Sequence, residues 1–183
     1  MKKLLVTLAA VLVSASAFAQ GTIQFSTFNS ARGVNAPVYA PGGTAAGTGA
    51  GTLGTVNAQL FLVGAGGALT ALTPATTFNT AGGAASRYVL IPTSNVTVPN
   101  VPAGGSANVI LRAWIGADYD SATIRNQSAQ LTVNNLGGTP AGGGAPLQPA
   151  VLAGLQGFEL VPEPSTLAFG LLGAAALLYR RRK

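Results

Sequence analysis

Apolar and polar residues alternate along two stretches in the middle of the chain. The clearest is SANVILRAWI, residues 106–115, in which five apolar residues share one parity: Ala107, Val109, Leu111, Ala113 and Ile115. In TVNAQLFLV, residues 55–63, four apolar residues share one parity: Val56, Ala58, Leu60 and Leu62. Because successive side chains of a strand point to opposite faces, each stretch predicts a β-strand with one buried face.

Shorter apolar runs occupy much of the rest of the middle of the chain. They are GTIQFSTF (21–28), RYVLIP (87–92), SNVTVPNV (94–101), AQLTVNNL (129–136) and GFELV (157–161). Turns rich in Gly, Pro, Asn and Thr separate these runs, and no stretch shows sustained helical spacing with helix caps. Many short strands joined by such turns predict an all-β fold, with an antiparallel β-sandwich or a similar architecture.

Two glycine-rich stretches, residues 41–55 and 137–149, interrupt this pattern and predict surface loops. Residues 49–54 within the first match G-x-G-x-x-G, the fingerprint of a dinucleotide site. Such a site needs a strand before the glycines, a helix after them and an acid about 20 residues further on. Here a predicted strand follows, and no acid occurs before Asp118, so we reject this interpretation.

The charge of the chain is concentrated at its two ends. Ten Lys and Arg residues against four acids give a net charge of +6, which by itself suggests a nucleic-acid-binding protein. Lys2, Lys3 and the cluster at 180–183 account for most of the positive charge. Between the ends the charges balance, with four scattered arginines and four acids. The arginines are Arg32, Arg87, Arg112 and Arg125, and the acids are Asp118, Asp120, Glu159 and Glu163. Binding phosphates requires clustered cations, so we expect no nucleic-acid partner.

The sequence contains no Cys and no His. It therefore has no disulfides and no thiolate chemistry, and it lacks the commonest general base and metal ligand. Asp118 and Asp120 are the only close pair of carboxylates, and they fit a polar turn better than a calcium loop or a glycosidase pair. We therefore expect no catalytic residue, no metal site and no cofactor, and a protein that is not an enzyme.

The first twenty residues, MKKLLVTLAAVLVSASAFAQ, have the three parts of a secretory signal peptide. Two lysines precede a short apolar stretch, and small residues follow, ending in Ala17-Phe18-Ala19. Ala17 and Ala19 suit the small pockets of a signal peptidase, which predicts cleavage between Ala19 and Gln20. The apolar stretch is short for a permanent membrane span. We expect export, with a signal peptide over residues 1–19.

The last stretch, VPEPSTLAFGLLGAAALLYRRRK (161–183), combines an extended motif, an apolar run and a basic end. Pro162 and Pro164 keep the backbone extended and remove two N–H donors. The uncharged run 166–179 would form a helix about 21 Å long, shorter than the hydrocarbon core of about 30 Å. The cluster Arg180, Arg181 and Arg182 would keep this end in the cytoplasm, by the positive-inside rule.

This order of features resembles the PEP-CTERM sorting signal of Gram-negative bacteria. The resemblance implies that an integral-membrane processing enzyme, exosortase, recognises Pro162, Glu163 and Pro164. It also implies that residues 167–179 are a transient membrane anchor and that Arg180, Arg181 and Arg182 are its cytoplasmic stop. The sorting system is associated with exopolysaccharide and biofilm production. An ordinary C-terminal membrane anchor is the alternative interpretation.

The body between the two ends resembles the passenger region of a group of PEP-CTERM proteins. The similarity is carried by AQGTIQFSTF (19–28), VNAPVYAPGG (34–43), AQLFLVG (58–64), VPAGGSANVILRAWIG (101–116) and GLQGFELVPEPS (154–165). That group has no established biochemical activity, so this likeness supports the family and implies no specific function.

Trp114 is the only tryptophan and lies on the parity opposite Val109 and Leu111. If that face is exposed, Trp114 with Arg112 and the nearby Tyr119 could form a stacking platform for a sugar ring. If the face is covered, Trp114 is a core residue, which is the commoner role of a single Trp in a β-sandwich.

The sequence therefore predicts a signal peptide (1–19), a β-rich passenger domain (20–160) and a sorting signal (161–183). The expected function is that of an exported, non-enzymatic protein of the cell surface or extracellular matrix. Its expected partners are signal peptidase, exosortase, the membrane and exopolysaccharide. The alternative is a carbohydrate-binding module at the same location. An exported hydrolase is disfavoured because His and Cys are absent and acids are few.

Overall fold

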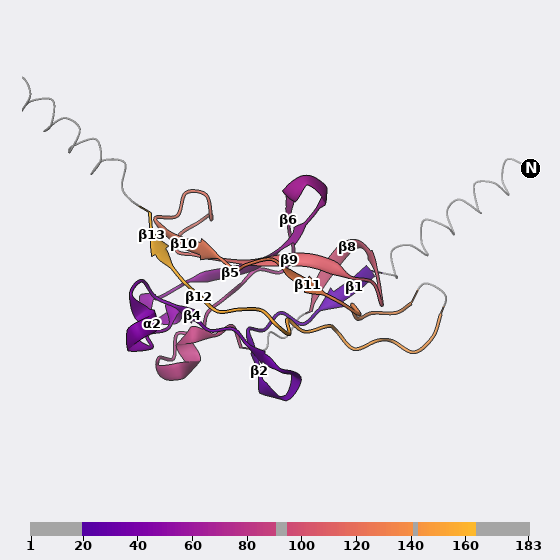
Figure 1. Cartoon of the computed structure of the whole chain (residues 1–183), viewed down its shortest axis with the longest axis horizontal. Helices are drawn as coiled ribbons and strands as arrows, with labels where there is room; N and C mark the ends of the chain where they lie inside the picture. The colour runs from indigo at the N-terminus through magenta and orange to yellow at the C-terminus, as the bar shows by residue number, and fades with distance from the viewer. Residues whose placement is uncertain (1–19, 91–94, 141–142, 164–183) are drawn as a thin grey trace, which may run out of the picture.

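The computed structural model describes residues 20–90, 95–140 and 143–163 of the chain (Figure 1). The predicted signal peptide at 1–19 and the apolar run at 166–179 lie outside the described residues. Among the residues that are described, no helix is long and apolar enough to cross a membrane.

Two long antiparallel strands form the centre of the main sheet. They are β5 (Asn57–Val63) and β9 (Ala107–Trp114), and Leu60 lies opposite Leu111. Both strands coincide with the two alternating stretches, and both leucines are fully buried, so the predicted strands and their buried faces are confirmed. The period of two places every second side chain of each strand in the core.

Shorter strands extend the main sheet on both sides of this pair. On the β5 side these are β6 (Leu69–Ala71) and β7 (Thr76–Thr77). On the β9 side these are β10 (Ile124–Gln127) and β11 (Leu131–Val133), and β13 (Val161–Pro162) pairs with the outer edge of β10. The C-terminal end of the described chain therefore forms one edge of the sheet.

The other strands form short pairs, and β1 (Gln20–Ile23) pairs antiparallel with β8 (Val96–Pro102). The pair β2 (Phe28–Asn29) and β3 (Val34–Asn35) is a hairpin. The pair β4 (Val38–Tyr39) and β12 (Phe158–Glu159) is parallel, which departs from the antiparallel prediction. In Figure 1, β2, β4 and β12 lie below the main sheet. The fold is mostly β, as predicted, but short pairs and loops form its second layer.

The hydrophobic core lies between the main sheet and this second layer. Its fully or almost fully buried members from outside the main sheet include Ile23, Phe25, Val38, Leu152 and Leu160. They pack in one cluster with the inner residues of β5 and β9. The strands close to the C-terminal end are thus held by the same core as the N-terminal strand.

The glycine-rich stretch 41–55 is not a simple surface loop: the prediction was wrong for the buried residues 49–51, whereas residues 52–55 are exposed. It contains the helical turns α2 (Gly43–Ala46) and η2 (Ala50–Leu53), and Ala50 and Gly51 are buried. A Cβ at Gly51 would lie 2.0 Å from the backbone oxygen of Asn79. The small residues allow close packing of backbone against backbone, which a prediction of loops from glycine content does not anticipate.

The strand predicted at 87–92 does not form in the described residues of that stretch. Instead the 3-10 helix η4 (Gly83–Arg87) precedes an irregular segment. Val89 is buried, and its N–H donates to the Thr27 hydroxyl while its carbonyl accepts from the Thr27 N–H, both at 3.0 Å. Two hydrogen bonds between Val89 and Thr27 therefore take the place of strand pairing here.

The described residues also contain two further short helical turns, η1 (Ser30–Arg32) and η3 (Ala65–Gly67).

Candidate functional site

The beginning of the Pro-Glu-Pro motif is part of the main sheet. In the pairing of β13 with β10, Val161 lies opposite Arg125 and Pro162 lies opposite Ile124. Proline lacks an N–H donor, and an edge strand tolerates it because only one side of the strand is paired. Both residues of β13 are exposed, so this pairing buries little side-chain surface.

Glu163 continues the contact beyond β13 through its backbone and its side chain. Its N–H donates to the Thr123 carbonyl at 2.8 Å. Its carboxylate forms an ion pair with the Arg125 guanidinium. The exposed fraction is 49% for the Glu163 side chain and 22% for that of Arg125. The central acid of the predicted motif is therefore bound to the body of the protein.

Arg125 is itself held in place by the turn that connects β9 and β10. Its guanidinium carbon lies 5.1 Å from the centre of the Tyr119 ring, and Nη1 donates to the Tyr119 carbonyl at 2.5 Å. Asp120 lies 3.8 Å from the same guanidinium, but its side chain is almost fully exposed. These contacts orient the guanidinium toward Glu163.

The predicted stacking platform exists as a cluster with a different arrangement. Arg112 lies 4.2 Å from the Tyr119 ring centre and 4.8 Å from that of Phe61, and Tyr119 meets Trp114 edge-on at 6.0 Å. Trp114 is only 6% exposed, which matches the core alternative. Its Nε1–H has no partner among the described residues. The structure brings Trp114, Arg112 and Tyr119 together, but no exposed Trp114 face is available for a sugar.

The Tyr119 ring packs against Trp114 and Arg112 in this cluster. Burial raises the pKa of the Tyr119 phenol above its ordinary value of 10.0, although the positive charges of Arg112 and Arg125 act in the opposite direction. The phenol is therefore neutral at physiological pH, and both arginines contact an uncharged ring. Such cation–π contacts stabilise the turn over the sheet.

The remaining acids bind to neighbouring groups of the fold. Asp118 accepts a hydrogen bond from the Ser121 hydroxyl at 2.9 Å, as expected for a polar turn. Glu159 accepts from the Gly42 N–H at 2.5 Å and from the hydroxyl of Thr44. Hydrogen bonds from Thr44 and then from Gly42 lower the pKa of Glu159 below its ordinary value of 4.5. Within the described ranges, no three acids gather as metal ligands would.

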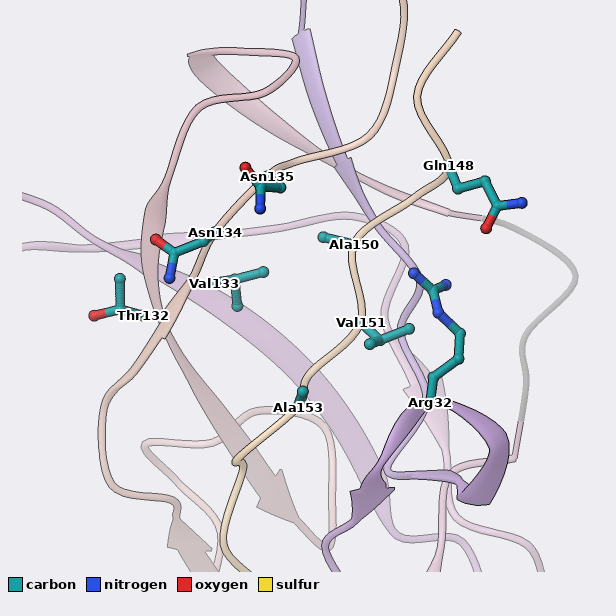
Figure 2. A pocket seen from close by; sticks show the side chains of 9 residues that line it. All are labelled: Arg32, Thr132, Val133, Asn134, Asn135, Gln148, Ala150, Val151 and Ala153. Carbon is teal, nitrogen blue, oxygen red and sulfur yellow. The ribbon is translucent and has the colours of Figure 1, made fainter.

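A second candidate site is a polar surface pocket beside β11, with a volume of about 330 Å³. Figure 2 shows its lining, which consists of Arg32, Thr132, Val133, Asn134, Asn135, Gln148, Ala150, Val151 and Ala153. The Arg32 guanidinium reaches the segment that follows Gln148 and donates a hydrogen bond to the Pro149 carbonyl at 3.0 Å. The pocket offers amide groups and one guanidinium, with no carboxylate and no aromatic ring in its lining.

Several residues that the sequence singled out lie outside the described residues. These are Ala17 and Ala19 at the predicted cleavage site, with Pro164, Arg180, Arg181 and Arg182 of the sorting signal. Gln20 is described and begins β1. Sequence reasoning missed Arg125 as the partner of Glu163, because 38 residues separate the two and no local pattern connects them.

The comparisons with known proteins bear on the C-terminal stretch. A family model described as the PEP-CTERM protein-sorting motif matches residues 160–183. No curated protein and no solved structure matches the chain. The matched residues include β13 and Glu163, so the motif begins inside the folded sheet. The chain therefore carries a PEP-CTERM protein-sorting motif, which marks it as an exosortase-sorted protein that is exported and processed at a membrane.

Proposed function

We propose that residues 20–160 form a non-enzymatic structural protein of the cell surface or extracellular matrix, associated with exopolysaccharide. The observation that carries this proposal is the sorting motif at 160–183. Sorting of this kind delivers a folded passenger to the outside of the cell, where a β-rich body without disulfides must be stable by its own core.

The distribution of titratable groups in the described body supports a structural role. The described residues contain four acids, three in the body and Glu163 in the motif, and each contacts a hydrogen-bond donor or an arginine. Asp118 contacts Ser121, Asp120 and Glu163 contact Arg125, and Glu159 contacts Gly42 and Thr44. A hydrolytic site needs acid and base groups that converge on a cleft. These acids are used to fasten turns and strands.

Cell fractionation tests this proposal in the native host. We expect the protein in the surface or matrix fraction of a strain that contains exosortase, together with exopolysaccharide. In a strain without exosortase we expect it to accumulate in the inner membrane. A distribution that is the same in both strains would contradict the proposal.

A carbohydrate-binding module is the second candidate, and the pocket in Figure 2 favours it. Amide groups and a guanidinium can bind the hydroxyl and carboxylate oxygens of a polysaccharide. Arg32→Ala should weaken binding to isolated exopolysaccharide at least several-fold. Arg112→Ala is the matched control, because Arg112 lies in the Tyr119 cluster and not in the pocket. Equal binding by both variants and the unaltered protein would exclude the pocket as the sugar site.

A further inference from the structure

We propose that the body of the protein competes with exosortase for the sorting motif, and that Arg125 determines how long Glu163 stays bound to the body. This inference rests on exosortase processing as part of the proposed function. Arg125 is thus a positioning residue for the motif, at a distance of 38 residues in the chain.

The motif uses its recognisable groups for contacts within the fold. Pro162 is paired in β13, the Glu163 N–H donates to Thr123, and the Glu163 carboxylate binds Arg125. An enzyme that reads Glu163 in an extended peptide needs the same carboxylate and the same backbone groups. The Glu163 N–H is a single donor, and a segment paired with β10 cannot lie in an enzyme's binding site at the same time, so the docked state and the enzyme-bound state exclude each other.

The segment just before the motif is fixed to the body by two hydrogen bonds and by core packing. The Asn126 side chain donates to the Glu159 carbonyl at 2.7 Å, and the Leu160 N–H donates to the Tyr39 carbonyl at 2.9 Å. Leu160 is fully buried in the core. The chain is therefore anchored at 159–160, and the motif leaves the body at a defined point on the sheet edge.

The strand β13 can detach without unfolding of the body. Val161 and Pro162 are exposed, and the ion pair between Arg125 and Glu163 is partly exposed. Short edge segments with little buried surface open locally at low cost. Only the released fraction can bind the enzyme, so any change that raises this fraction raises the rate of processing.

Pulse–chase labelling of the full chain in a host with exosortase tests the inference. Arg125→Gln removes the charge that holds Glu163, and we expect processing to become about two- to fivefold faster, the range that a partly exposed ion pair supports. Arg125→Lys keeps the charge and should restore a rate near that of the unaltered chain.

The matched control is Arg112→Gln. Arg112 lies on the same outer face and contacts the same Tyr119 ring, but its side chain donates to Gln127 and not to Glu163. We expect no change in its rate of processing. An equal acceleration in both variants would overturn the inference, because the loss of the Tyr119 contact would then be the cause.

Hydrogen exchange on the purified full chain without exosortase gives a second readout. The Glu163 amide should be protected in the unaltered chain and should exchange faster in Arg125→Gln, while the amides of β5 and β9 keep their protection. An unprotected Glu163 amide in the unaltered chain would overturn the inference whatever the variant does.

The outcomes separate the inference from the proposed function. Absence of any processing of the unaltered chain would contradict the proposed function. Normal processing of the unaltered chain, with an unchanged or slower rate in Arg125→Gln, would contradict the competition and leave sorting intact.

Discussion

At the residue scale, Leu60 and Leu111 face each other across the two central strands and are fully buried. Truncating such a side chain removes transfer free energy and leaves a cavity that the neighbouring strands cannot fill. The stability of the body therefore depends on a few inward positions of β5 and β9.

Leu111→Ala should lower the free energy of unfolding by about 2–5 kcal/mol, measured by urea denaturation. The control is Leu69→Ala, because Leu69 on β6 is 36% exposed and its truncation should cost no more than about 0.5 kcal/mol. Similar losses in the two variants would contradict the assignment of the core.

Gly51 shows why a residue of the glycine-rich stretch matters to packing. Gly51→Ala would place its Cβ against the backbone oxygen of Asn79, and overpacking of this kind destabilises a protein by about 1–3 kcal/mol or more. Gly64→Ala is the matched control, since its Cβ would meet the Ala68 oxygen at an ordinary 3.5 Å. Thermal unfolding should show a lowered midpoint for the first variant only.

At the scale of elements, Glu159 connects β12 to the turn at α2. Its lowered pKa means that the folded state holds the charged carboxylate more strongly than the unfolded state does. This contribution to stability is present above the ordinary pKa of 4.5 and is lost as the pH falls through the lower folded pKa.

Thr44→Val removes the hydrogen bond that lowers this pKa most. We expect the variant to lose part of the stability difference between pH 6 and pH 3 that the unaltered protein shows in urea denaturation. Glu159→Gln should lose more of this difference, because it removes the titrating carboxyl and so also the contribution of the Gly42 N–H. A pH dependence identical to that of the unaltered protein in both variants would contradict the assigned role of Glu159.

The long strands could be predicted from the sequence, whereas several short elements could not. In β5 and β9 the period of two persists over seven and eight residues, and one buried face specifies the register. Val89 also lies in an apolar run, but its backbone bonds to Thr27, and the described part of that run, residues 87–90, forms no strand. The pairing of two-residue strands such as β4 and β12 depends on contacts distant in sequence.

Part of the candidate site could likewise be predicted from the sequence, and part of it depends on the fold. The motif Pro162-Glu163-Pro164 is a local pattern, and the family model confirms a sorting motif over residues 160–183. The ion pair of Glu163 with Arg125 depends on the fold, since an arginine in a strand of mixed residues carries no local signal of its partner. The sequence left Trp114 as either an exposed stacking residue or a core residue, depending on whether its face of the strand is covered. Tyr119 packs against Trp114 and covers that face.

At the scale of the whole molecule, the described body and the sorting motif overlap. The main sheet takes in β13, whose two residues belong to the matched motif, so the passenger continues into the signal without a free linker. We therefore expect this chain to be exported, processed near the motif and delivered outside the inner membrane as a β-rich body.

The intact mass of the protein, measured in fractions of its native host with and without exosortase, distinguishes a processed and delivered body from a permanently anchored chain. We predict a species that begins at Gln20 and ends within residues 162–165, found outside the inner membrane only when exosortase is present. Additional mass on that species would show attachment to another molecule. A species that still ends at Lys183, in the inner membrane of both strains, would contradict the account.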